Sequence, residues 1–299
     1  MSLRATSLTI LAVLCGAAPA VHAAAPTTAR TVAAARTLGV GPEAQRLRGR
    51  FLPAARLVRT GGAAPRRLGA THLGGSPDLP AGTRWPTCNG HPLSLLEQID
   101  LAALNRAVPG QTRGRGTLAI FVGLGTDARG NFDLLAIDGR ALRTGSCVAV
   151  VHTPPGRRLV ARATPKGAKT LPRTAVRLRP TLTVPEYHVA DKLLGRKFDL
   201  AFANAWDRLT RRATTGDLSR PAPAAPLRQL LGWSLPRNLD PTLLPPCHGV
   251  RPVRLLAQFD SDAPFDLDDT AGGSLLLTLP AADLRAGRFD RICAEDQLD

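Results

Sequence analysis

The sequence predicts an α+β fold that is sheet-rich, internally duplicated and equipped with a few short helices. Three observations support this prediction: a series of short apolar runs, a motif that occurs twice, and two segments with helical spacing of apolar residues. The apolar runs have strand length and are bounded by Gly, Pro or charged residues, which favours β-structure. They cover residues 118–122, 134–137, 148–151, 159–161 and 176–178.

The repeated motif predicts the duplication. Residues 92–100 read PLSLLEQID and residues 252–260 read PVRLLAQFD, so one pattern occurs in both halves of the chain. Each copy follows a cysteine and precedes an apolar run that begins with glycine. We interpret the pair as one β-rich unit present twice, with halves over about residues 68–160 and 225–293 that are related by a pseudo-twofold axis.

Two segments space their apolar residues as an amphipathic helix does. The first covers residues 42–59, with Leu47 and Phe51 among its apolar positions. The second covers residues 192–209, where Phe202 and Trp206 fall on one side. We therefore predict a short helix in each segment.

The segment 1–23 has the features of a signal peptide. Arg4 supplies a basic start, residues 8–14 supply a short apolar run, and small residues precede a cleavage position after Ala23. The apolar run is too short for a permanent membrane anchor, and no later stretch of about 18 apolar residues follows. We predict a secreted protein, extracellular or associated with the cell envelope, without a transmembrane segment.

The remaining chain divides in two by composition. Residues 24–41 are rich in Ala, Thr, Arg and Gly and predict a disordered leader. Residues 42–299 then form the duplicated domain, which is long enough to bury a large core.

Four cysteines remain after the predicted signal peptide: Cys88, Cys147, Cys247 and Cys293. In an exported chain they predict two disulfides, for which three pairings exist. The symmetry of the two halves favours Cys88–Cys147 and Cys247–Cys293, and a Cys88–Cys247 bond is the alternative. Only Cys247 and His248 place two metal ligands together, so we predict no metal site.

The chain is strongly basic, with a formal net charge of +16. Residues 156–179 hold eight Lys or Arg and no acid, a pattern that predicts binding to an anionic polymer. A solvated loop and strand edge is the alternative. Outside the cell the expected partners are an anionic envelope polymer or another protein, and no nucleic acid. The candidate residues are Arg157, Arg158, Arg162, Lys166, Lys169 and Arg173.

Several segments together resemble the YwqG-like family, bacterial proteins with a domain of unknown function. They are residues 73–86, 92–101, 230–233, 255–262 and 283–290, so the resemblance spans about residues 68–293. It implies a sheet-rich α+β fold with an internal duplication and no established activity. Members typically carry a Trp-Gly-Asp element after the Gln-x-Asp-Ser-Asp segment, and this chain lacks it. A ligand site that the element forms in relatives would therefore be lost here.

Polar residues within the repeated motif are the candidates for ligand binding: Gln98, Asp100, Gln258, Asp260 and Asp262. Asp100 and Asp260 could act as acid and base if they lay at a suitable separation. The alternative is structural, because buried polar side chains usually satisfy backbone groups at strand ends. The acidic residues at 260–269 lack the ligand spacing of an EF-hand and predict an acidic surface loop, with weak calcium binding as the alternative.

The chain carries no G-x-S-x-G elbow, no H-E-x-x-H motif and no phosphate-binding loop lysine. We therefore expect a non-catalytic binding or interaction module of the cell envelope or extracellular space, without a cofactor. Two alternatives remain: an envelope hydrolase that uses Asp100 and Asp260, and a partner protein in an interbacterial competition system.

Overall fold

The computed structural model describes residues 26–126, 132–133, 147–197, 199–219, 227–235, 247–260 and 274–297. The predicted signal peptide, the expected strand at 134–137 and the candidate ligand residue Asp262 lie outside the described residues.

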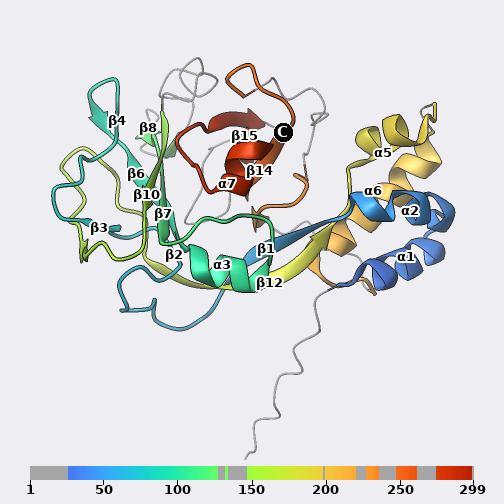
Figure 1. Cartoon of the computed structure of the whole chain (residues 1–299), viewed down its shortest axis with the longest axis horizontal. Coiled ribbons are helices and arrows are strands. Elements are labelled where there is room, and N and C mark those ends of the chain that lie inside the picture. The colour runs from blue at the N-terminus through green and yellow to red at the C-terminus, as the bar shows by residue number, and fades with distance from the viewer. Residues whose placement is uncertain are drawn as a thin grey trace, which may run out of the picture.

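A ten-stranded antiparallel sheet forms the body of the molecule and curls until it is nearly closed (Figure 1). The strand order is β10-β7-β6-β2-β12-β1-β13-β14-β15-β16. At its centre β1 and β12 pair along the whole of β1, from Leu52 opposite Thr183 to Arg59 opposite Val176. The bounds are β1 (Leu52–Arg59), β2 (His72–Leu73), β6 (Ser94–Asp100), β7 (Thr117–Val122), β10 (Val148–Thr153), β12 (Thr174–Thr183), β13 (Arg228–Leu230), β14 (Val253–Asp260), β15 (Ser274–Pro280) and β16 (Cys293–Gln297).

Three two-stranded sheets flank this body. They are β3 (Asp78–Pro80) with β11 (Leu159–Ala161), β4 (Thr87–Cys88) with β5 (His91–Pro92), and β8 (Gly125–Thr126) with β9 (Phe132–Asp133). The helices are α1 (Thr28–Thr37), α2 (Gly41–Leu47), α3 (Leu101–Ala107), α5 (Tyr187–Leu194), α6 (Leu200–Thr215) and α7 (Ala281–Ala286). The prediction of a sheet-rich protein with a few short helices is therefore confirmed.

The main core fills the concave side of the sheet and draws residues from both of its ends. Alternate residues of β7 show how the sequence specifies this side, because strand side chains point in turn to opposite faces. Leu118 and Ile120 join the main core, whereas Ala119 and Phe121 pack on the convex side in a smaller cluster with Cys88. Phe259 of β14 enters the same main core from the other end of the sheet.

Helices α1, α2, α5 and α6 form a separate layer at one end of β1 and β12 (Figure 1). Its core surrounds Trp206, which is fully buried and donates a hydrogen bond from Nε1 to the carbonyl of Pro185 at 2.7 Å. The polar and apolar residues of α6 separate into two faces. Asp199 caps its start and Gly216 ends it in a left-handed conformation, so both ends of this helix follow from local sequence signals.

Two predictions about the N-terminal region are wrong. Within the expected disordered leader at 24–41, residues Thr28–Thr37 form α1, and Val32 and Ala35 are buried against the helical layer. The expected helix at 42–59 ends at Leu47 and gives way to strand β1, because the ladder with β12 outweighs a weak helical pattern. The helix expected at 192–209 is divided at Gly195, whose φ of 65° ends α5.

The cysteines pair within the halves, as the symmetry argument favours: Cys88 with Cys147 and Cys247 with Cys293. The alternative bond between Cys88 and Cys247 is therefore wrong. Each disulfide ties the segment before one copy of the repeated motif to an outer strand of the sheet, β10 or β16. Among the described residues, no helix is long and apolar enough to cross a bilayer.

Candidate functional site

Gln98 holds the turn after β2 against β6. The side chain is fully buried, and its Nε2 donates to the carbonyl of Ala70 at 3.1 Å and to Asp78 Oδ2 at 2.9 Å. Its Oε1 accepts the backbone N–H of Asp78 at 2.7 Å. These contacts occupy both ends of the amide, so they agree with the structural alternative for Gln98.

Asp100 ends β6 and starts α3. Its Oδ1 accepts the backbone N–H groups of Ala102 at 2.9 Å and Ala103 at 3.2 Å, as an N-cap does. Its Oδ2 accepts a hydrogen bond from Nη2 of Arg67 at 2.8 Å, and 13% of the side chain is exposed. Asp100 therefore reaches solvent while both of its carboxylate oxygens accept from donors.

Gln258 and Asp260 make an equivalent clamp at the other end of the sheet. Gln258 accepts the backbone N–H of Leu235 at 2.8 Å and donates to the carbonyl of the same residue at 2.9 Å. Asp260 accepts the N–H of Leu227 at 2.8 Å and the hydroxyl of Ser274 at 2.7 Å. Both side chains are buried, and both stabilise the segments on either side of β13.

The structure gives Asp100 and Asp260 separate environments. In the order of the sheet β2, β12, β1 and β13 lie between β6 and β14. Asp100 accepts hydrogen bonds from α3 and Arg67, whereas Asp260 accepts them from Leu227 and Ser274. An acid and base pair needs two carboxyl groups that face one substrate bond. The contacts of Asp100 and Asp260 instead stabilise the ends of their own strands.

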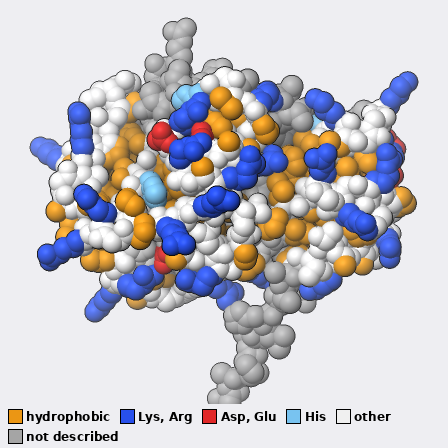
Figure 2. Space-filling model, in the orientation of Figure 1, with side chains coloured by type: hydrophobic (Ala, Val, Ile, Leu, Met, Phe, Trp, Pro, Cys, Tyr) orange, Lys and Arg blue, Asp and Glu red, His pale blue; other side chains and the backbone are white. Residues whose placement is uncertain are grey.

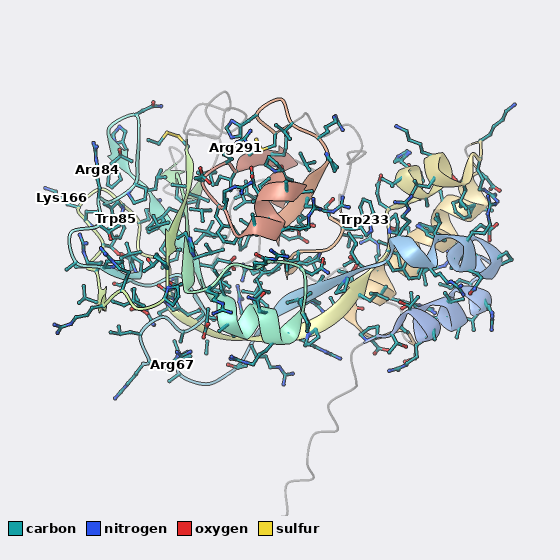
Figure 3. All side chains as sticks on the ribbon, in the orientation of Figure 1. Arg67, Arg84, Trp85, Lys166, Trp233 and Arg291 are labelled. Carbon is teal, nitrogen blue, oxygen red and sulfur yellow. A yellow bond between two sulfur atoms is a disulfide. The ribbon has the colours of Figure 1, made fainter. Side chains whose placement is uncertain are left out.

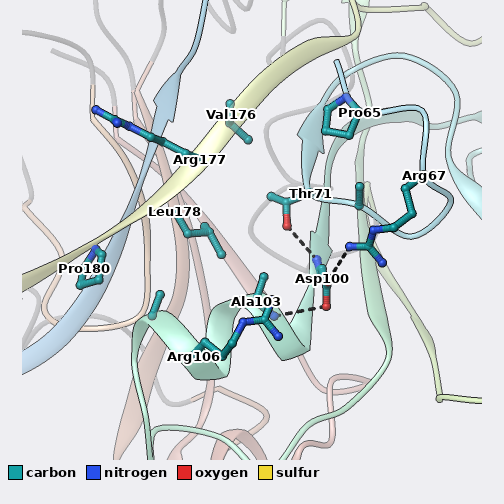
Figure 4. A pocket seen from close by; sticks show the side chains of 12 residues that line it. Pro65, Arg67, Thr71, Asp100, Ala103, Arg106, Val176, Arg177, Leu178 and Pro180 are labelled. Atoms are coloured by element: carbon teal, nitrogen blue, oxygen red, sulfur yellow. Dashed lines mark hydrogen bonds and ion pairs between the residues drawn. The ribbon is translucent and has the colours of Figure 1, made fainter. Parts of the chain in front are cut away.

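An open pocket of about 530 Å³ lies between α3 and β12, and we call it the α3 pocket (Figure 4). Its apolar lining comes from both elements, and its polar lining includes Asp100, Thr71 and three arginines. The arginines come from a loop, a helix and a strand that are far apart in the sequence. The full lining is Pro65, Arg67, Ala70, Thr71, Asp100, Ala103, Arg106, Ala107, Val176, Arg177, Leu178 and Pro180.

The structure divides the predicted basic residues of the 156–179 segment into two groups. Arg162 donates to the carbonyls of Pro80 and Thr83, and Arg173 donates to those of Ser76 and Pro65, so both guanidinium groups hold loops together. Lys169 is half-buried. The exposed members are Arg157, Arg158 and Lys166.

The pairing of β11 with β3 adds Arg84 to these three cations. Leu159 pairs with Pro80, which brings residues 157–158 beside the chain that leads to the exposed Arg84. We call Arg84, Arg157, Arg158 and Lys166 the β11 basic face. Sequence reasoning missed Arg84 because it lies far from the basic segment along the chain.

Glu97 is a buried ionisable residue that the sequence analysis did not single out. It has no exposed surface, and neither carboxylate oxygen has a hydrogen-bond partner among the described residues. It pairs across the sheet with Leu73 and Ile120, both in the main core. Burial raises the pKa of Glu97 to about 8, and the positive charge of Arg228 opposes this rise. The sequence does contain a signal for this residue: Glu97 is a charged residue inside the apolar motif at 92–100, and the equivalent position of the second copy is Ala257.

Cys247, His248 and Cys293 bring three potential metal ligands within 4.8 Å of one another. The two sulfur atoms are joined in a disulfide, so they cannot act as the thiolates that bind zinc. The Nε2 atom of His248 lies 3.3 Å from the carbonyl of Ile292. This cluster therefore gives no metal site in the oxidised protein.

Comparison with known proteins identifies the family at the level of its domain. No curated protein matches the chain. The model of a domain of unknown function, DUF1963, matches residues 71–297. The match includes every strand of the large sheet except β1, and it leaves α1 and α2 outside as well. The chain belongs to the DUF1963 family, whose function is not known.

Proposed function

We propose that this protein is an exported, non-catalytic module that binds an anionic polymer of the cell envelope through the β11 basic face. The observation that carries the proposal is the exposure of four cations on one small surface. Among the described residues, no carboxylate lies within ion-pair distance of Arg84, Arg157, Arg158 or Lys166. Their charges therefore remain available to a polyanion.

The backbone beneath this face is held by tertiary contacts. Arg162 fastens β11 to the turn after β3 by its two hydrogen bonds. The segment that carries Lys166 passes close to β5, because a Cβ atom added to Gly167 would lie 3.5 Å from the ring of Pro92. Trp85 donates a hydrogen bond from Nε1 to the carbonyl of Leu93 at 2.8 Å. Figure 3 shows Arg84, Trp85 and Lys166 together at the end of the molecule away from the helical layer. A partly exposed indole beside cations suits a polymer with sugar rings as well as anionic groups.

The rest of the surface favours the same class of partner. Figure 2 shows Lys and Arg side chains spread over the whole visible face, with few acidic side chains among them. A net charge of +16 attracts polyanions from a distance, and the β11 basic face supplies local contacts. Binding that neutralises four anionic groups should weaken with salt, with a slope of log affinity against log salt of roughly −3 to −4.

The test compares two charge-matched variants of the mature chain. The first replaces Arg84, Arg157, Arg158 and Lys166 by Gln, and the control replaces the exposed Arg36, Arg46, Lys192 and Arg208 of the helical layer. Affinity for a polyglycerol-phosphate polymer is measured over a range of salt concentrations. We expect the first variant to lose most of the affinity and the salt slope, while the control keeps both. Equal losses in the two variants would mean that net charge alone drives binding.

The contacts of Asp100 and Asp260 support a non-catalytic role over the hydrolase alternative. Each carboxylate accepts hydrogen bonds from backbone or side-chain donors of its own neighbourhood, as a structural cap or clamp does. An acid and base pair instead needs two carboxyl groups that face one substrate bond. Hydrolysis of wall polymers that disappears in an Asp260→Asn variant with an unchanged melting temperature would reverse this conclusion.

Export is part of the proposal, and the two disulfides support it. Disulfides persist in oxidising compartments and are rare where thiols are kept reduced. The described structure places all four cysteines of the mature chain in such bonds. Mass spectrometry of the protein from its native host should find a mature N-terminus at Ala24 in the extracellular or envelope fraction. A full-length chain in the cytoplasmic fraction would contradict export.

We also infer that the two halves descend from one duplicated unit. Strands at the same distance from the two ends of the sheet form equivalent pairs: β10 with β16, β7 with β15, β6 with β14 and β2 with β13. The register shifts between Leu95 and Glu97 in β6 and between Leu255 and Ala257 in β14, at the same position of the repeated motif. Gln98 and Gln258 then clamp equivalent loops. Superposition of the two sets of strands in an experimental structure should overlay both bulges and both disulfides.

A further inference from the structure

We infer that the α3 pocket binds a small amphiphilic anion, with a carboxylate or phosphate head and a hydrocarbon body. This site is distinct from the β11 basic face and goes beyond the polymer-binding function proposed above. The inference rests on the shape of the pocket, on its apolar wall and on Arg67 and Arg106, which reach it from a loop and from α3 (Figure 4).

The apolar wall provides a place for the hydrocarbon body. On β12 it consists of Val176, Leu178 and Pro180, and on α3 it includes Ala103 and Ala107. Val176 and Leu178 are only partly buried by the main core, so apolar surface remains open to the pocket. A volume of about 530 Å³ falls within the range of pockets that hold small organic ligands.

Arg67 provides an oriented donor for the anionic head. Asp100 accepts from one of its N–H groups at 2.8 Å, and Asp100 itself is fixed by the backbone of α3. The Arg67 side chain is nevertheless 70% exposed, so its remaining N–H groups are open to solvent beside the pocket. A planar guanidinium group held in place by one carboxylate is suited to bind a second carboxylate or a phosphate in a bidentate manner.

Arg106 makes the pocket positive overall. It is exposed on the last turn of α3, and among the described residues no carboxylate lies within ion-pair distance of it. Arg177 borders the opposite side, where Figure 4 shows its side chain directed away from Asp100. Arg67 and Arg106 together outweigh the single carboxylate of Asp100, so the pocket favours an anion over a neutral or cationic ligand of the same size.

Isothermal titration calorimetry on the disulfide-intact mature protein tests the inference. The probes are octanoate, octyl phosphate and neutral 1-octanol, all below their aggregation concentrations. We expect both anions to bind more tightly than octanol by about tenfold or more, because octanol lacks the charge that Arg67 and Arg106 recognise. The tighter of the two anions then indicates whether the natural ligand is a carboxylate or a phosphate.

Three variants separate the parts of the site. Arg106→Gln and Arg67→Gln should each weaken binding of the anions by about tenfold and leave octanol unaffected. Ala103→Leu keeps every charge, fills the pocket from a helical position that tolerates leucine, and should remove binding of all three probes. Arg208→Gln on α6 is the matched charge control, and the four-residue variant of the β11 basic face should bind the probes normally.

Arg67→Gln also removes the contact with Asp100 and can therefore destabilise the fold. In that case Arg106→Gln provides the test, because no described contact joins Arg106 to Asp100. The inference is overturned if the wild-type protein binds neither anion at millimolar concentration or binds octanol equally well. It is also overturned if Arg106→Gln and Arg208→Gln have the same effect, or if Ala103→Leu binds as the wild type does. None of these results depends on polymer binding by the β11 basic face.

Discussion

Replacement of Glu97 by glutamine should stabilise the protein, and the gain should increase with pH. Glutamine has nearly the same shape as glutamic acid but cannot ionise, so Glu97→Gln removes one buried titratable group from the main core. In the native protein burial raises the pKa of Glu97 from 4.5 to about 8. The native state therefore binds the extra proton between pH 4.5 and 8, and the free energy of unfolding falls as pH rises through this window.

The size of the effect follows from the same two values. At pH 7 the native state keeps Glu97 protonated, whereas the same carboxyl group is ionised in the unfolded chain. Each pH unit within the window costs about 1.4 kcal/mol, so this difference lowers the free energy of unfolding by about 3 kcal/mol at pH 7. His72 acts in the opposite direction at lower pH, because burial and the charge of Arg173 lower its pKa from 6.5 to about 4. The difference between Glu97→Gln and wild type cancels the contribution of His72 and isolates that of Glu97.

Urea unfolding with intact disulfides, followed by circular dichroism from pH 4 to 8, measures this difference. We expect it to be near zero at pH 4.5 and to reach about 3 kcal/mol in favour of Glu97→Gln at pH 7. Asp207→Asn on α6 is the control: its side chain is 43% exposed and pairs with Arg211, so the variant should differ from wild type by less than about 1 kcal/mol. A difference for Glu97→Gln that does not vary with pH would refute the reasoning.

Three further predictions concern the sheet and its loops. Gly116→Ala should lower the free energy of unfolding by more than about 2 kcal/mol, because φ is +91° and the added Cβ would clash with the carbonyl oxygen of Thr153. Gly62→Ala is the control: it has open space around it and should leave the stability unchanged in the same urea assay. Gln258→Leu should cost about 2–4 kcal/mol, because it leaves partly buried backbone groups of the loop after β13 without their partner. An unchanged unfolding midpoint would contradict that role. Replacement of both Cys247 and Cys293 by serine should cost about 2–4 kcal/mol in calorimetry under oxidising conditions. If the variant has the same melting temperature as the oxidised wild type, the disulfide contributes no stability.

The sequence alone determined the features that depend on neighbouring residues. The repeated motif at 92–100 and 252–260 located β6 and β14, since the apolar run and the terminal aspartate are encoded within each copy. The symmetry of the two copies also favoured the correct disulfides. Short apolar runs located β7, β10, β11 and part of β12. These elements are specified locally, because a run of apolar residues between turn-forming residues has few other ways to bury its surface.

Tertiary structure decided the elements whose local signal was weak. The polar and small residues before position 41 suggested disorder, yet α1 is stabilised by contacts of Val32 and Ala35 with a helical layer to which α5 and α6 belong, much further along the chain. The pattern at 52–59 fits a helix or a strand, and pairing with β12 selects the strand. Neither outcome could be derived locally, because the stabilising contacts join segments that are distant in the sequence.

The candidate sites show the same division. Asp100 and the basic segment were visible in the sequence, whereas the α3 pocket exists only where a loop, a helix and β12 meet. Arg84 joins the β11 basic face through a strand pair, and Arg162 and Arg173 leave it because backbone carbonyls accept their hydrogen bonds. The amino-acid sequence specifies which side chains carry charge. The fold decides which of these ionisable groups are exposed, which are paired and which, like Glu97, are buried and held protonated, because desolvation and pairing depend on three-dimensional neighbours.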